Sequence, residues 1–181
     1  MLKEMVFAGF GGQGVLSLGT LLAYGAMKEG KEVSWFPSYG PEMRGGTANC
    51  MVNISDEKIS SPIDTEFDIA VVFNKPSLEK FEPRVKKDGI LIWESSTIDK
   101  GPTRKDIRAY AVPAIKIASE KLENTKVMNM IAMGALVKVS QIIKTESVHT
   151  ALKETLPQRY HHLLPLNKKA LKMGMDLVEK K

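Results

Sequence analysis

The sequence predicts an α/β protein of three layers, α/β/α, with helices on both faces of a mixed, mostly parallel sheet and a Rossmann-like start. Short apolar runs alternate along the chain with longer segments whose apolar residues recur at helical spacing. The first run leads directly into a glycine-rich turn and a helix, as in dinucleotide-binding folds. At 181 residues the chain suffices for one well-packed core, so residues 1–181 are expected to form a single domain.

The expected strands are short apolar runs bounded by glycine, proline or polar clusters. They are residues 5–8, 33–36, 49–54, 67–73, 90–93 and 108–112. Only about ten residues, rich in glycine and proline, connect the second strand to the third, whereas a parallel crossover needs a dozen or more. These two strands are therefore expected to run antiparallel.

The expected helices follow from apolar residues at helical spacing. They are residues 15–28, a helix that starts near Pro76 with Leu78, Phe81 and Val85 on its inner face, and residues 127–143, 147–156 and 167–179, with 157–165 as a linker. Residues 127–143 are apolar on almost every side, which suits a helix packed between the sheet and another surface. Asn129 in this segment needs a hydrogen-bond partner, either nearby backbone or a group across an interface.

Composition excludes several classes of function. The net charge is +5, but no basic run interleaved with aromatic residues suggests nucleic-acid binding. Cys50 is the only cysteine, so no internal disulfide, iron–sulfur cluster or structural zinc site is expected, and the histidines lack supporting metal ligands. The longest apolar stretch is too short to span a bilayer, and the first strand leaves no room for a secretion signal. A cytoplasmic protein without membrane contact is expected.

The glycine-rich turn is the first candidate site. Residues 9–14 read Gly-Phe-Gly-Gly-Gln-Gly, which fits the G-x-G-x-x-G pattern between a strand and a helix. Glycines let a phosphate approach the main chain, and the free amides and dipole of the first helical turn favour negative charge. The alternative is a tight strand-to-helix turn without a ligand, but the position of the turn favours an anion site.

A nicotinamide dinucleotide is disfavoured as the anion. NAD needs an Asp or Glu at the end of the second strand, about twenty residues after the last glycine. That position is Ser34, and the only acid of this strand, Glu32, stands at its beginning. NADP would need a basic residue near the strand end, where none stands.

A second loop, residues 38–46 (SYGPEMRGG), is the more specific signal. It should leave the second strand at the same sheet edge as the glycine turn, where open α/β sheets bind ligands. Among its glycines it carries the hydroxyl of Ser38, the phenol of Tyr39, the carboxylate of Glu42 and the guanidinium of Arg44. The alternative is a solvated turn with an incidental ion pair.

The two motifs together, GFGGQGV after the first strand and SYGPEMRGGTANC ahead of the third, resemble the gamma subunit of 2-oxoacid:ferredoxin oxidoreductases. The same unit occurs as an internal domain of fused pyruvate enzymes. The resemblance implies a mixed-sheet α/β/α fold and a part in oxidising a 2-oxoacid with coenzyme A to acyl-CoA and carbon dioxide, with ferredoxin as the electron acceptor. The amino-acid sequence of the second loop favours 2-oxoglutarate or branched-chain 2-oxoacids over pyruvate as the substrate.

The resemblance also implies how labour is divided in the complex. Thiamine diphosphate is held by alpha and beta subunits, and 4Fe–4S clusters by the beta and a ferredoxin-like subunit, so this chain is expected to be inactive alone. The hypothesis is that both loops help to bind coenzyme A, with amides 11–14 on its pyrophosphate, Arg44 on a phosphate and Tyr39 on the adenine or pantetheine. The competing hypothesis is that Arg44 and Glu42 pair with the alpha or beta subunit and fix the interface.

The candidate cofactor-binding residues are Gly9, Gly11, Gly12, Gln13, Gly14, Ser38, Tyr39, Gly40 and Arg44, and no catalytic or metal-binding residue is predicted. Two alternatives stay open, a stand-alone domain that binds an anionic nucleotide and a structural adaptor with an empty glycine loop. A surface that partners normally bury would make a homodimer plausible for the isolated chain.

Overall fold

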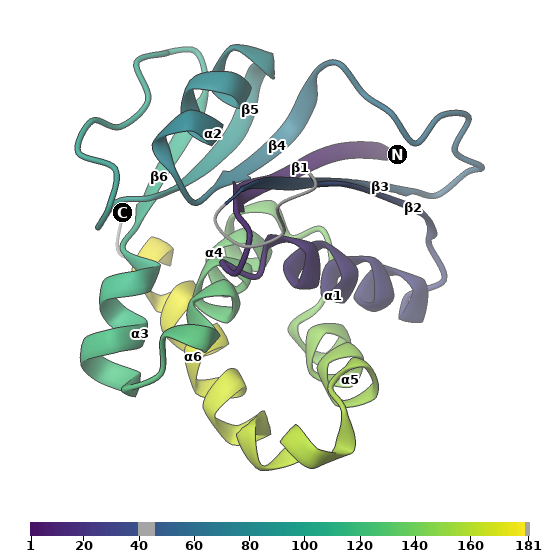
Figure 1. The fold of residues 1–181 in the computed structure, drawn as a ribbon. Coiled ribbons are helices and arrows are strands. Elements are labelled where there is room, and N and C mark those ends of the chain that lie inside the picture. Colours follow the sequence, from purple (N-terminus) through teal and green to yellow (C-terminus); the bar gives the residue numbers. More distant parts are fainter. Residues whose placement is uncertain (40–45, 180–181) are drawn as a thin grey trace.

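The computed structural model describes residues 1–39 and 46–179. Six strands form one sheet in the order β2-β3-β1-β4-β5-β6 (Figure 1). Their bounds are β1 Leu2–Phe10, β2 Glu32–Tyr39, β3 Thr47–Ser55, β4 Phe67–Val72, β5 Val85–Glu94 and β6 Arg108–Val112. The six predicted strands are therefore confirmed, although β1, β2 and β5 are longer than expected.

The direction of the strands places the two candidate loops. Strand β3 is antiparallel to both of its neighbours, β1 and β2, whereas β1, β4, β5 and β6 are mutually parallel. The predicted antiparallel pairing of the second and third strands is thus confirmed. Because both β1 and β2 run opposite to β3, they share one direction, and their carboxyl ends lie at the same edge of the sheet.

Helices cover the two faces of this sheet unequally (Figure 1). Their bounds are α1 Val15–Lys28, α2 Lys75–Phe81, α3 Ala114–Leu122, α4 Met128–Ser140, α5 Thr145–Thr155 and α6 Leu164–Glu179. Only α2 covers one face, where it packs on Val6, Ala8 and Phe67. The other face carries the larger core, built with α1, α3 and α4, while α5 packs on α1 and α6 on α4.

Helix α4 is enclosed as its sequence predicts. Most of its residues are buried, because one side faces the sheet and another faces α6. The two helices cross at a pair of glycines. A Cβ atom at Gly134 would lie 1.9 Å from the carbonyl oxygen of Leu171, and one at Gly174 would lie 1.9 Å from that of Ile131. Only hydrogen at these two positions allows the backbones to approach so closely.

Three expectations about individual elements are wrong. Val85 begins β5 instead of continuing the preceding helix, because Pro83 lies in a 3-10 turn, Glu82–Arg84, that ends it. Helix α3 was not predicted, and its first turn is completed by a distant group, the Glu94 carboxylate, which accepts from the Ile115 amide at 2.9 Å. The expected linker contains a 3-10 helix, Gln158–Leu163.

Candidate functional site

The two candidate loops meet at one edge of the sheet. The glycine turn leaves β1 after Phe10, and the second loop leads from the end of β2 to the start of β3. The amide of Gly11 donates to the carbonyl oxygen of Gly46, with 2.8 Å between nitrogen and oxygen. This bond ties the glycine turn to the last residue of the second loop, as the strand directions require. Gly40 and Arg44 lie outside the described residues, as does the side chain of Tyr39.

Gln13 shapes the glycine turn from within. Its Oε1 accepts from the Phe10 amide at 2.7 Å, and its Nε2 donates to the carbonyl oxygen of Phe73 at 3.2 Å. Gly9 is required beneath it, since a Cβ there would lie 2.6 Å from Oε1 of Gln13. Both polar atoms of the Gln13 amide are therefore used inside the protein. Gln13 therefore positions the turn through this side chain, and its second Nε2 hydrogen is the donor that remains for a ligand.

The geometry of the turn narrows the set of amides that can face an anion. The Gly11 amide is bonded to Gly46, and the Gln13 amide donates to the carbonyl oxygen of Phe10 at 3.1 Å. The expectation that all amides from 11 to 14 face a pyrophosphate is therefore corrected. The amides of Gly12 and Gly14 have no partner among the described residues. Both glycines have positive φ, +99° and +76°, which side chains disfavour.

Helix α1 continues this set of free donors. The first intrahelical bond comes from Leu18, whose amide donates to the carbonyl oxygen of Gly14 at 2.9 Å, so the three preceding amides have no acceptor within the helix. Gly14 provides no side-chain cap, and the first turn contains no acidic residue. By contrast, the Asn74 side chain caps α2. The positive end of the α1 dipole is thus left without a neutralising group of its own.

A hollow of about 310 Å³ lies directly over these amides. Its lining residues are Phe10, Gly11, Gly12, Gly14, Val15, Leu16, Ser17 and Ala48. A larger groove of about 580 Å³ also includes Leu16 and Ser17 in its lining and extends along α1 toward Trp35, Lys126 and Tyr160. The two cavities are therefore neighbours. Together they offer amide hydrogens at one end and aromatic, apolar and amide side chains at the other.

Asn129 joins the site from a distant part of the chain. It stands in the first turn of α4 and lines the groove. Its Nδ2 would lie 3.1 Å from a Cβ on Gly14, so a side chain there would press against Asn129 in addition to the cost of the positive φ. The Asn129 side chain makes no hydrogen bond among the described residues, so a partner in nearby backbone and a partner across an interface both stay predictions. In the sequence, Asn129 stood out only as a polar residue within an apolar helix.

Two further predicted features lie near this edge. Ser38 is exposed and pairs with Asn49 of β3, but it does not belong to the lining of either cavity. Cys50 is buried beneath α1, where its Sγ donates to the carbonyl oxygen of Val15 at 3.5 Å. Burial raises the pKa of this thiol to about 12, so it stays protonated and inert at neutral pH.

Glu32, the only acid of the second strand, pairs with Ser55 at the far end of β3, away from the glycine turn. This placement agrees with the prediction that NAD is not the ligand.

Residues 4–177 match the family described as pyruvate ferredoxin/flavodoxin oxidoreductase. The chain belongs to this family. Within the described residues, no group of three or more His, Cys, Asp or Glu side chains is arranged to hold a metal ion.

Relatives within the oxidoreductase family occur as separate subunits and as parts of longer chains. The ketoisovalerate oxidoreductase subunit VorA of Methanothermobacter marburgensis is 39% identical over 178 residues, which are 96% of this chain and 36% of that protein. The chain thus spans only about a third of this relative. The crystal structure of a keto/oxoacid ferredoxin oxidoreductase gamma subunit from Geobacter sulfurreducens matches over 99% of both chains, with TM-score 0.84 and 28% identity.

A third relative was solved with ligands. The 2-oxoglutarate:ferredoxin oxidoreductase of Magnetococcus marinus contains 2-oxoglutarate, coenzyme A and succinyl-CoA, and matches 99% of this chain and 31% of its own, with TM-score 0.89 and 26% identity. These matches confirm the α/β fold and the resemblance to the gamma subunit. Every helix within the described residues is too short or too polar to cross a bilayer.

Proposed function

We propose that this chain is a single-domain, cytoplasmic gamma subunit of a 2-oxoacid:ferredoxin oxidoreductase, and that its glycine turn helps to hold coenzyme A. The proposed binding of coenzyme A rests on the hollow over the uncapped start of α1. Coenzyme A carries a pyrophosphate and a 3′-phosphate, and unsatisfied amides at a helix start stabilise such groups. The family and the coenzyme A named for the Magnetococcus marinus enzyme support the choice of ligand.

In this proposal the amides of Gly12, Gly14 and the first turn of α1 hold a phosphate, and the neighbouring groove takes part of the rest of the ligand. Gln13 keeps the turn in shape, and Asn129 lies beside it. Arg44 remains a second phosphate partner proposed from its place in the sequence. The chain contributes binding and assembly. Partner subunits supply thiamine diphosphate and the iron–sulfur clusters, and ferredoxin accepts the electrons.

Ser17 offers a sharp test of the phosphate site. It is exposed in the first turn of α1 and lines the hollow. A carboxylate at this helix position interacts favourably with the dipole, so Ser17→Asp should leave the fold unchanged or slightly more stable. The same carboxylate would repel a bound phosphate by about 1–2 kcal/mol, which corresponds to roughly a tenfold weaker interaction. Ser17→Asn has nearly the same shape without the charge and serves as the control.

The measurement is steady-state kinetics of the reconstituted complex. We expect Ser17→Asp to raise the KM for coenzyme A about tenfold, with an unchanged KM for the 2-oxoacid and intact assembly by gel filtration. Ser17→Asn should behave as the wild type. An unchanged KM for coenzyme A in Ser17→Asp would contradict the phosphate role. Arg44→Ala separates ligand binding from interface contact, because loss of assembly without a change in this KM would assign Arg44 to the interface.

The proposed substrates are 2-oxoglutarate or a branched-chain 2-oxoacid. This choice rests on the amino-acid sequence of residues 38–46. The Methanothermobacter marburgensis relative is named a ketoisovalerate oxidoreductase subunit, and ketoisovalerate is a branched-chain 2-oxoacid. A panel of 2-oxoacids offered to the co-purified native complex tests it, and a clear preference for pyruvate would refute it. The isolated chain should oxidise none of them.

A further inference from the structure

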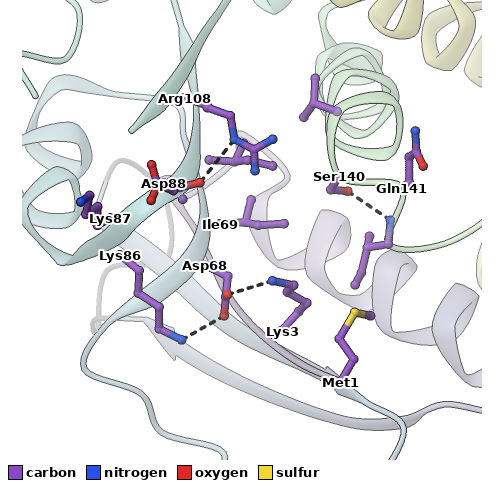
Figure 2. Close-up of a pocket in the computed structure, with 14 residues that line it drawn as sticks. Met1, Lys3, Asp68, Ile69, Lys86, Lys87, Asp88, Arg108, Ser140 and Gln141 are labelled. Carbon is purple, nitrogen blue, oxygen red and sulfur yellow. Dashed lines mark hydrogen bonds and ion pairs between the residues drawn. The ribbon is translucent and has the colours of Figure 1, made fainter. Parts of the chain in front are cut away.

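A third cavity, of about 670 Å³, lies away from the glycine turn, at the edge of the sheet where the parallel strands begin (Figure 2). Its walls come from β1, β4, β5 and β6 on one side and from the end of α4 on the other. It shares no lining residue with the hollow or the groove described above. A ligand here would therefore not occupy the proposed coenzyme A site.

The floor of this cavity is apolar. Ile69 of β4 and Ile90 of β5 are direct partners in the sheet, with only 3% and 4% of their surfaces exposed. Ile142, which follows α4, is 6% exposed and faces the same space. Aliphatic side chains on strands and a helix end cannot hydrogen-bond, so the part of a ligand that covers them should be a hydrocarbon body.

Arg108 stands at one side of this floor. It is the sheet partner of Ile90 on the neighbouring strand, β6, so both side chains extend from the same face. Figure 2 shows its guanidinium directed toward the space in front of α4. Its Nε donates to the carbonyl oxygen of Asp88 at 3.3 Å. The two terminal nitrogens have no partner among the described residues, so the edge of the guanidinium that binds a carboxylate in two parallel bonds is open.

Two of the three lysines that line the cavity are already paired with carboxylates. Lys3 and Lys86 both contact the carboxylate of Asp68, at 3.1 and 3.0 Å, and Lys86 also pairs with Glu4. Figure 2 shows this ion-pair group on the opposite side of the floor from Arg108. The charges of this group compensate one another, whereas Arg108 and Lys87, which also lines the cavity, have no carboxylate partner within the described part of the chain. The Asp88 carboxylate also lines the cavity and offsets one of these two charges, so a ligand with one negative group fits this distribution better than a polyphosphate.

We propose that this cavity binds a small carboxylic acid with a short aliphatic body, held by Arg108 at its carboxylate and by Ile69, Ile90 and Ile142 along its body. The volume lies within the range of small-molecule sites, roughly 300–1,000 Å³. Two kinds of metabolite share this chemistry, a branched 2-oxoacid and the amino acid with the same side chain. The proposal does not depend on the coenzyme A site.

The test uses the full chain, labelled at isoleucine methyl groups, and titrations at constant ionic strength. The probes are 3-methylbutanoate, 3-methyl-2-oxobutanoate and valine, with inorganic phosphate and 3-methylbutanol as controls. We expect at least one probe to shift the methyl signals of Ile69, Ile90 and Ile142 with saturation. A ligand of this size has few atoms, so the Kd should be on the order of 1 mM. Which probe binds more tightly decides between the 2-oxoacid and the amino acid.

Two arginine variants localise the binding. Arg108 is exposed, so Arg108→Gln should fold normally, and it should weaken binding about tenfold or more because a charged, two-bond contact is lost. Arg159→Gln, on the remote 3-10 helix Gln158–Leu163, removes an equal charge and should bind as the wild type. The absence of a saturable shift up to about 20 mM ligand, a concentration far above the Kd expected for a small ligand, would overturn the proposal. So would equal binding by Arg108→Gln, or equal shifts with phosphate or the alcohol.

Discussion

Replacing Gly134 by alanine tests the close crossing of α4 and α6. The new Cβ would lie 1.9 Å from the carbonyl oxygen of Leu171, 2.9 Å from its carbonyl carbon and 3.0 Å from the amide nitrogen of Met175. All three are backbone atoms, so no side-chain rotation can relieve the clash. A carbon–oxygen contact needs about 3.3 Å, and the helices must therefore separate by roughly 1.4 Å at this point.

The expected cost follows from this displacement. Overpacking of a buried contact costs typically about 1–3 kcal/mol, and here the value should be near the upper end because the backbone itself must move. Alanine returns about 1 kcal/mol through its higher helix propensity. We expect Gly134→Ala to lower the free energy of unfolding by about 2 kcal/mol and the Tm by about 4–8 °C for a domain of this size.

Gly25→Ala is the matched control, since Gly25 is also buried within a helix, α1. Its new Cβ would meet the Cδ1 atom of Ile143 at 2.7 Å, the end of a flexible side chain that can turn away. This variant should be neutral or more stable by up to about 1 kcal/mol. Urea unfolding followed by circular dichroism measures both variants. If Gly134→Ala proved as stable as Gly25→Ala, the close contact of the two helices would be refuted.

Three further predictions concern single side chains. Gln13→Ala removes the acceptor of the Phe10 amide and the donor to the Phe73 carbonyl, so the chain should lose about 1–2 kcal/mol in urea unfolding; an unchanged midpoint would contradict this role. Cys50, with its pKa raised from 9.0 to about 12, should react with iodoacetamide about 10³-fold more slowly in the folded than in the unfolded chain at pH ~8; equal rates would show that the thiol is accessible. Burial, followed by the nearby Glu4 carboxylate, raises the pKa of Asp64, so the folded state holds this proton more tightly than the unfolded state does. Stability should therefore fall as the pH rises from about 4 through the folded pKa, and Asp64→Asn, compared by urea unfolding at several pH values, should reduce that fall.

Much of the fold could be read from local patterns. The connection after β2 has only about ten residues, which excluded a parallel crossover. The helical spacing of apolar residues in 15–28 placed α1 directly after the glycine turn. Helix α3 escaped prediction because part of its stabilisation comes from Glu94, which lies twenty-one residues away along the chain. Pro37 was expected to end β2, but it lies inside this strand, where an edge position tolerates its missing amide hydrogen.

The sequence by itself determined the two glycine-containing loops, the direction of the strands that bring them to one edge, and the family to which they point. These features depend on residues close together in the chain. Only the tertiary structure decided which amides remain free, since the bond from Gly11 to Gly46 spans thirty-five residues. It alone also paired Gly134 with Gly174 and placed Arg108 beside Ile90 at a separate cavity. Such contacts depend on distances between segments remote in the chain, which no local pattern of residues encodes.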